Sequence, residues 1–252
     1  MTRLPRPEVV FLDVGDTLVR PDPSWSGVYI AALADHGIHV SEAALERAFA
    51  AAMTSEYWSG EGPYEATEAA SWARIVGFDQ LVLTALGYPD QPQEVFRAIE
   101  SRFGAHASWH VFPDVLPALD ALRAAGLRLA VISNWVWGAP ELLHELELAG
   151  HFESLVISAR VGYSKPSAAI FEHALRVTGV SPDRAVHVGD QYRADILGAR
   201  SVGITGGLLE RRGRDLDALG VPAAEQPSMP LIRDLGGLLE LLDIAVATGT
   251  VA

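Results

Sequence analysis

The chain has 252 residues, of which 49% are hydrophobic and 20% charged, so it can form a sizeable core and is not intrinsically disordered. Its formal net charge of −13 disfavours nucleic acid or an anionic membrane surface as a partner. It has no cysteine, which excludes disulfides and thiolate metal sites, and no apolar stretch approaches the ~18 residues of a membrane span. Since no signal-peptide pattern follows Met1 either, we expect a cytoplasmic protein.

The first predicted element is a buried strand at residues 9–12, a run of Val, Phe and Leu without a polar break. Asp13 follows at its end, and Gly15 allows a sharp turn before Asp16 and Thr17. A carboxylate at the carboxyl end of a buried parallel strand lies where open α/β sheets bind their ligands. The same residues would also fit a strand that ends in an Asx turn without a function.

Residues 19–110 show helical patterns throughout and no strand pattern. Serine and threonine residues placed before apolar, helix-periodic segments are typical helix caps. The predicted helices cover residues 25–36, a segment from Ser41 through Phe49, residues 67–86 and residues 93–103, with a loop at 59–63. Four helices without a strand predict a small helical bundle.

From Pro113 onward the pattern alternates between helices and strands. The predicted strands cover residues 127–132, 155–157, 185–188 and 203–209, and the predicted helices cover 115–125, 140–149, 167–178, 193–201 and 232–245. The segment 210–230, rich in glycine, proline and charge, is a predicted loop, and 248–252 is a predicted frayed tail.

Strand–helix alternation of this kind predicts a parallel sheet with right-handed crossovers. The expected fold is therefore α/β, with a doubly wound, Rossmann-like parallel sheet in a core domain made of residues 1–18 and 111–252. The helical segment 19–110 is then a cap domain inserted after the first strand.

Polar residues end three of the predicted strands, namely Asp13, Ser133 and Asp190. Asp195 follows five positions after Asp190, and Lys165, the single lysine of the chain, lies in a loop before a helix. Neighbouring strands of a doubly wound sheet end at one rim, which would gather three carboxylates, a hydroxyl and an ammonium group. Clustered carboxylates repel one another unless a cation lies among them. A hard divalent ion with oxygen ligands fits this set, and we expect Mg²⁺.

Four short motifs in this order resemble those of the haloacid dehalogenase superfamily, and within it the Mg²⁺-dependent, phosphatase-like branch with an all-helical cap after the first motif. The motifs are Asp-Val-Gly-Asp-Thr-Leu at 13–18, Val-Ile-Ser-Asn at 131–134, Lys-Pro at 165–166 and Gly-Asp-Gln-Tyr-Arg-Ala-Asp at 189–195. Each motif is weak alone. Four of them in order, each at its expected strand or loop, make a specific signal that spans the core and the position of the cap.

The resemblance implies a hydrolase that acts on a small phosphorylated metabolite through an aspartyl-phosphate on Asp13. Lys165 would neutralise charge on Asp13 and on the phosphoryl group, and Ser133 would donate a hydrogen bond to a phosphoryl oxygen. Asn134 and Thr17 are further candidates for substrate binding. The implied magnesium ligands are Asp13, the backbone carbonyl of Gly15, Asp190, and Asp195, the last through water or by orienting the loop.

The chain departs from the resembled pattern at Gly15, where phosphatases of the family usually carry an Asp that protonates the leaving group. The nearest carboxylate is one position later, at Asp16; neighbouring turn residues point in different directions, so whether Asp16 replaces the missing acid stays open. General acid–base help is worth ~10²–10⁴-fold, so slow turnover or a preference for good leaving groups is expected. Two alternatives stay open. The first is metal-independent cleavage of a carbon–halogen bond, against which the paired Asp190 and Asp195 argue. The second is a binding or regulatory protein on a catalytically weakened fold.

Overall fold

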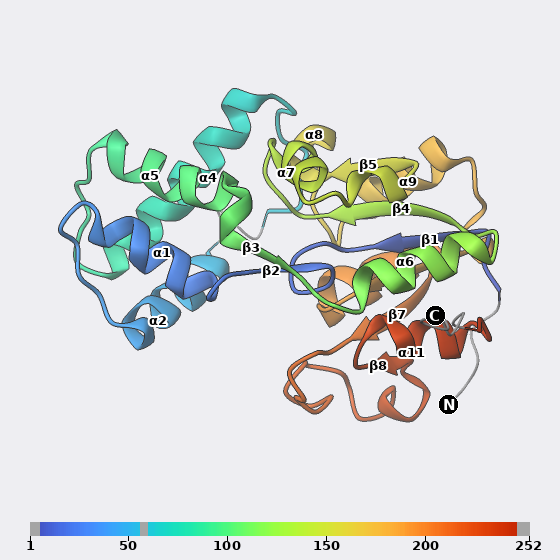
Figure 1. Cartoon of the computed structure of the whole chain (residues 1–252). Coiled ribbons are helices and arrows are strands. Elements are labelled where there is room, and N and C mark those ends of the chain that lie inside the picture. The colour runs from blue at the N-terminus through green and yellow to red at the C-terminus, as the bar shows by residue number, and fades with distance from the viewer. Residues whose placement is uncertain (1–5, 56–59, 246–252) are drawn as a thin grey trace, which may run out of the picture.

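A six-stranded parallel sheet forms the centre of the computed structural model, which describes residues 6–55 and 60–245 (Figure 1). The strand order is β5-β4-β1-β6-β7-β8, and each adjacent pair is parallel. These strands are β1 (Val9–Leu12), β4 (Arg128–Ser133), β5 (Ser154–Ile157), β6 (Ala185–Gly189), β7 (Thr205–Leu209) and β8 (Leu231–Ile232). Counted along the chain, the order is that of the Rossmann-like doubly wound sheet, so the predicted fold class is confirmed.

Helices cover both faces of this sheet. One face packs against α6 (Val115–Ala124), α7 (Ala139–Glu145) and α11 (Leu235–Leu241), and the other against α9 (Ala168–Thr178) and the short α10 (Gly198–Ser201). Successive side chains of a strand point to opposite faces, so Val10 and Leu12 join the first core while Val9 and Phe11 join the second. Burial on both faces explains why β1 is an unbroken apolar run.

A separate group of helices forms the lobe on the left of Figure 1. It comprises α1 (Trp25–Ala34), α2 (Glu42–Met53), α4 (Glu68–Ala85) and α5 (Gln93–Gly104), and we call it the helical lobe. Ser24, Ser41 and Thr67 cap the first three by accepting a backbone N–H of the first turn, as predicted. The lobe has its own apolar core, built around Tyr29 and Phe96.

Both ends of segment 19–110 differ from the prediction. Val19–Pro21 (β2) and Trp109–Val111 (β3) pair as an antiparallel ribbon that connects the helical lobe to the sheet, so the expectation of helix throughout is wrong there (Figure 1). Three residues are too few to show a periodicity of two, and each strand depends on a partner about ninety positions away in sequence. That the lobe and the core are separate domains with boundaries at residues 18 and 111 stays a prediction.

Smaller differences lie in the second half of the chain. The predicted helix 232–245 starts later, because Leu231–Ile232 extends the sheet as β8 and Asp234 then caps α11. The predicted helix 193–201 begins as a π-helix, η4 (Tyr192–Leu197), and continues as α10. A short helix, α8 (Ser158–Val161), was not predicted, and 3₁₀ turns lie at His106–Ser108, Ala149–His151, Pro182–Arg184 and Gln226–Ser228. The predicted tail 248–252 and Ser59 of the predicted loop lie outside the described residues.

The described part of the chain has no helix with the length and apolar character needed to span a membrane. Even α4, with 18 residues, carries Glu68, Arg74 and Asp79. The cytoplasmic location expected from the sequence stays a prediction.

Asp79 is buried in the core of the helical lobe, with only 3% of its surface exposed. The Tyr29 hydroxyl donates a hydrogen bond of 3.0 Å to its Oδ1, whereas Oδ2 has no hydrogen-bond partner among the described residues. Burial raises the pKa of Asp79 to about 7; the Tyr29 bond opposes this shift and the charge of Glu100 adds to it. An ionised Asp79 therefore destabilises the lobe.

Replacing Asp79 by Asn should stabilise the protein at alkaline but not at acidic pH. The folded state holds the proton up to a pKa of about 7, whereas the unfolded chain releases it near 3.8, so the wild type loses stability as pH rises through this window. Asn keeps an acceptor for Tyr29, and its advantage should reach about 4 kcal/mol by pH 8. Thermal unfolding at pH 4 and pH 8 measures it, with the exposed Asp90→Asn as control. An equal advantage at both pH values would contradict the assignment.

Candidate active site

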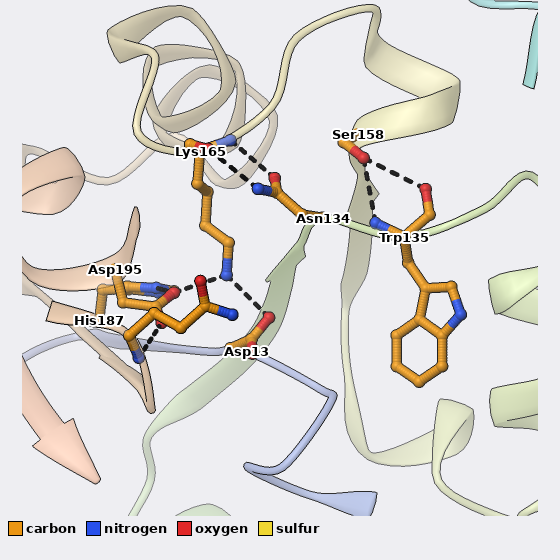
Figure 2. A network of polar contacts seen from close by, with 8 residues as sticks. Asp13, Asn134, Trp135, Ser158, Lys165, His187 and Asp195 are labelled. Carbon is orange, nitrogen blue, oxygen red and sulfur yellow. Dashed lines mark hydrogen bonds and ion pairs between the residues drawn. The ribbon is translucent and has the colours of Figure 1, made fainter. Parts of the chain in front are cut away.

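Asp13 lies directly after the central strand β1, at the rim where β4 and β6 also end (Figure 2). Its backbone N–H donates to the carbonyl of Val188 at 2.9 Å, which extends the ladder with β6 by one residue. The residue is 5% exposed, and its Oδ1 accepts a 2.7 Å hydrogen bond from Lys165 Nζ. Burial raises the pKa of Asp13, with Lys165 opposing that rise and the charge of Asp195 adding to it.

Lys165, the single lysine, lies between two buried carboxylates (Figure 2). Its Nζ is 2.7 Å from Asp13 Oδ1 and 2.5 Å from Asp195 Oδ1. Burial acts to lower the pKa of Lys165, but the two carboxylates outweigh it and raise the pKa, so the ammonium stays charged. The side chain of Asn134 holds the backbone of this residue, accepting from Lys165 N at 2.7 Å and donating to Lys165 O at 2.9 Å.

Asp195 lies in the π-helix η4, and three hydrogen bonds hold its carboxylate. Its Oδ1 accepts from Lys165 and from His187 Nε2 at 2.9 Å, and its Oδ2 accepts from the backbone N–H of Gln191 at 2.9 Å. Burial acts to raise the pKa of Asp195, but Lys165 and His187 outweigh it and hold the pKa below its usual range. Gly189 permits this close approach, since a Cβ there would lie 2.2 Å from Asp195 Cγ.

His187 is a functional-site neighbour that sequence reasoning missed. It is fully buried on β6, and burial lowers its pKa, so the ring is neutral and Nε2 carries the hydrogen donated to Asp195. The available signal was a histidine inside the apolar strand Ala185–Gly189, where a buried polar side chain requires a partner.

Asp190 follows β6 and completes a group of three acids. One oxygen each of Asp13, Asp190 and Asp195 lies within 4.8 Å of the others. Asp190 Oδ1 is buried and has no hydrogen-bond partner among the described residues. Burial raises the pKa of Asp190 well above its usual value, and the charges of Asp13, Asp195 and Asp16 add to the shift. A carboxylate with an unpartnered oxygen, beside two further acids, fits a bound hard cation.

Three other predicted residues lie around the same rim. Ser133 is the last residue of β4, the strand that pairs with β1, and is 1% exposed. Thr17 is fully buried, and its hydroxyl has no hydrogen-bond partner among the described residues. Gly15 forms an isolated bridge with Val19. Substrate contacts of Ser133, Asn134 and Thr17, and a metal contact of the Gly15 carbonyl, stay predictions.

Asp16, in the loop after β1, is held by two contacts. It has a left-handed backbone (φ 55°), its Oδ1 pairs with Arg212 at 2.9 Å, and its Oδ2 accepts from Trp25 Nε1 of the helical lobe at 3.1 Å. These residues line a cleft of about 370 Å³ that Asp190 also borders. A larger hollow of about 610 Å³ lies against α6 and has none of the predicted site residues in its lining.

Arg211 clamps the ribbon that connects lobe and core, a role that the predicted loop 210–230 did not reveal. Its Nη2 donates to Thr17 O and to Asp114 Oδ2, both at 2.9 Å, and its guanidinium lies 4.0 Å from the centre of the Phe112 ring. The buried Glu210 orders this loop by accepting the backbone N–H groups of Arg212 and Arg214. No local pattern signals the contacts of Arg211, because Thr17 and Asp114 are far away in the sequence.

Comparison with known proteins agrees with this geometry. The family model described as a haloacid dehalogenase-like hydrolase matches residues 7–203. The chain belongs to the haloacid dehalogenase-like (HAD) hydrolase family and is a hydrolase of that superfamily.

Individual relatives are similar over most of their length. The chain is 31% identical over 194 residues to the human haloacid dehalogenase-like hydrolase domain-containing protein 3, covering 76% of this chain and 77% of that protein. It is 32% identical over 160 residues to a phosphoserine phosphatase of Thermus thermophilus, covering 61% of this chain and 62% of that protein. The solved structure of the HAD-hydrolase YfnB from Bacillus subtilis, described as bound to magnesium, superimposes with a TM-score of 0.76 at 17% identity, covering 95% of this chain and all of that one.

Proposed function

We propose that this protein is a Mg²⁺-dependent phosphohydrolase that acts on a small phosphorylated metabolite through a covalent intermediate on Asp13. One observation carries the proposal: the buried Asp13 binds the ammonium of Lys165 and belongs to a group of three acids in which Asp190 Oδ1 has no hydrogen-bond partner among the described residues. A structural ion pair would need Lys165 but would leave no carboxylate oxygen unsatisfied.

Asp13 is the proposed nucleophile. Lys165 binds its Oδ1 and thereby orients the carboxylate, while Oδ2 makes no contact with Lys165. In the reaction, an Asp13 oxygen attacks phosphorus and the leaving oxygen departs with the electron pair of the broken bond. Lys165 offsets the charge of the nucleophile as it meets the anionic phosphoryl group, and Ser133 would donate a hydrogen bond to that group.

The three acids would hold the magnesium ion, with Asp13 and Asp190 as direct ligands. Asp195 already accepts from Lys165, His187 and Gln191, which suits a residue that orients the loop or binds through water. The bound cation would supply charge neutralisation for the acids and for the phosphoryl group. Carboxylate oxygens are the ligand type that Mg²⁺ prefers.

Segment 19–110 is proposed to act as a cap over the site, because the cleft that borders Asp190 is lined on its other side by Trp25. A small phosphorylated substrate agrees with phosphatases among the relatives. Besides the phosphoserine phosphatase, a glyceraldehyde 3-phosphate phosphatase of Methanothermobacter thermautotrophicus is 41% identical over 98 residues, covering 37% of this chain and 42% of that protein.

Phosphate release tests the proposal directly. Purified protein with Mg²⁺ should release phosphate from 4-nitrophenyl phosphate and acetyl phosphate, and EDTA should lower the rate by about 10²-fold or more, since the acids would then face the phosphoryl group without a cation. Added Mg²⁺ in excess of the chelator should restore the rate. No release from either compound at any Mg²⁺ concentration would overturn the proposal.

The same assay separates the two alternatives. Halide release from a 2-haloacid in the presence of EDTA would instead establish carbon–halogen cleavage. The unsatisfied oxygen of Asp190 weighs against this alternative, because a metal-independent reaction leaves that buried carboxylate without a function. A binding or regulatory protein would release neither phosphate nor halide.

A further inference from the structure

The backbone at Gly15 does not itself demand a glycine. Its φ is not in the left-handed region, and a Cβ built there would lie 3.5 Å from Trp25 Cζ2, an ordinary van der Waals contact. A longer side chain at position 15 would start in contact with the indole, which reaches this position from the helical lobe. Trp25 therefore lies next to position 15, in the loop that follows the proposed nucleophile Asp13.

Trp25 is held in this place by several contacts. It is the first residue of α1, after the cap residue Ser24, and its ring packs against Phe103 and Trp109 with centroids 5.7 and 5.5 Å apart. Its Nε1 donates to Asp16 Oδ2 at 3.1 Å. The ring is still 38% exposed and lines the cleft that Asp190 borders. A leaving group in this cleft would thus meet an aromatic surface.

Both carboxylate oxygens of Asp16 already have a partner. Arg212 pairs with Oδ1 at 2.9 Å and Trp25 donates to Oδ2, so either oxygen would have to lose a contact before it served a substrate. The left-handed backbone of this residue fixes the direction of the side chain. Asp16 joins the nucleophile loop to the helical lobe and to the loop that carries Arg212.

The side chains that contact Asp13 or end the neighbouring strands are not placed to protonate a leaving group, and two further acids of the cleft, Glu42 and Glu46, are exposed residues of α2 in the helical lobe. Lys165 donates to both Asp13 and Asp195. His187 is fully buried and faces Asp195. Ser133 and Thr17 offer hydroxyl groups, which are weak acids.

We propose that the site takes phosphoryl donors whose leaving group departs as a stable anion, such as acyl and aryl phosphates, and that Gly15 and Trp25 determine this specificity. The inference rests on the proposed function. The P–O bond breaks as Asp13 forms a P–O bond, and a carboxylate or phenolate keeps the electron pair without a proton, whereas an alkoxide needs one. Water then attacks phosphorus, the electron pair returns to Asp13, and the proton of the water passes to solvent.

A leaving-group series on the wild-type protein tests this specificity. With Mg²⁺, kcat/KM should fall in the order acetyl phosphate, 4-nitrophenyl phosphate, phenyl phosphate and glycerol 2-phosphate, by about 10²–10⁴-fold between the nitrophenyl and the alkyl ester, the size of a missing general acid. Values within about tenfold across the series would overturn this inference and leave the proposed function standing. No hydrolysis of any member would overturn both.

Two variants locate the cause. Asp16→Asn is a matched control, since Asn tolerates the left-handed backbone and keeps an acceptor for Trp25. In this variant, the ratio of kcat/KM for 4-nitrophenyl phosphate to kcat/KM for glycerol 2-phosphate should stay as in the wild type. A further loss of kcat/KM for glycerol 2-phosphate alone would instead show that Asp16 is the proton donor. The double variant Gly15→Asp with Trp25→Ala should lower this ratio, because it adds a carboxyl group at position 15 and removes the indole beside it. A folded double variant with an unchanged ratio would contradict the role of Trp25.

Discussion

Replacing Asp13 by Asn should lower kcat for 4-nitrophenyl phosphate by about 10⁵-fold or more, because an amide of the same shape cannot attack phosphorus. The fold should survive. Burial raises the pKa of Asp13, so the ionised carboxylate is unfavourable there, and an amide can still accept from Lys165. A steady-state assay with the wild type in parallel measures the loss, and thermal unfolding checks that the variant is folded.

The neighbouring Asp16→Asn is the control for this experiment, since it removes a carboxylate from the same loop without touching Lys165. It should retain most of the activity toward the nitrophenyl ester. If Asp13→Asn keeps more than about a tenth of the wild-type rate, Asp13 is not the nucleophile, and the covalent mechanism is wrong.

Lys165→Met should damage both activity and stability. The Lys165 ammonium lies against Asp13 and Asp195, and its loss leaves two buried carboxylates without their cation. Breaking a buried pair in this way costs about 3–5 kcal/mol, and removing one charged donor from a phosphoryl site lowers kcat by about 10²–10³-fold. Urea unfolding and the nitrophenyl assay measure the two effects.

Added Mg²⁺ should return part of the stability lost in Lys165→Met, because a cation among the three acids offsets the same charge. Arg193→Met is the matched control, since Arg193 pairs with Glu61 at 2.9 Å but is 68% exposed, and its loss should cost less than about 1 kcal/mol. Equal losses in the two variants, or no effect of Mg²⁺ on Lys165→Met, would argue against a charge cluster that binds a cation.

The sequence predicted the parts of the fold that depend on local patterns. The apolar run before Asp13 indicated a strand buried on both faces, and the caps Ser24, Ser41 and Thr67 marked three helices of the lobe. The polar residues after β1, β4 and β6 were expected to share one rim, because parallel strands end together. The structure gathers Asp13, Lys165, Asp190 and Asp195 there.

Contacts between distant segments could be settled only by the tertiary structure. The strands β2 and β3 have three residues each and exist because they pair across the length of the inserted lobe. His187 meets Asp195 because a π-helix turns the latter back over Gly189. The position of Trp25 over Gly15 joins a helix of the lobe to the loop after β1.

The sequence by itself therefore determined the fold class, the rim and the identities of the charged groups, since the apolar runs and the alternation of strands and helices are visible in neighbouring residues. The tertiary structure decided which oxygen atoms are satisfied and which are left open. Lys165 lies 152 positions from Asp13 and still binds it, whereas Asp190 Oδ1 has no hydrogen-bond partner among the described residues. Whether a buried polar atom has a hydrogen-bond partner depends on packing in three dimensions, and no local sequence pattern encodes it.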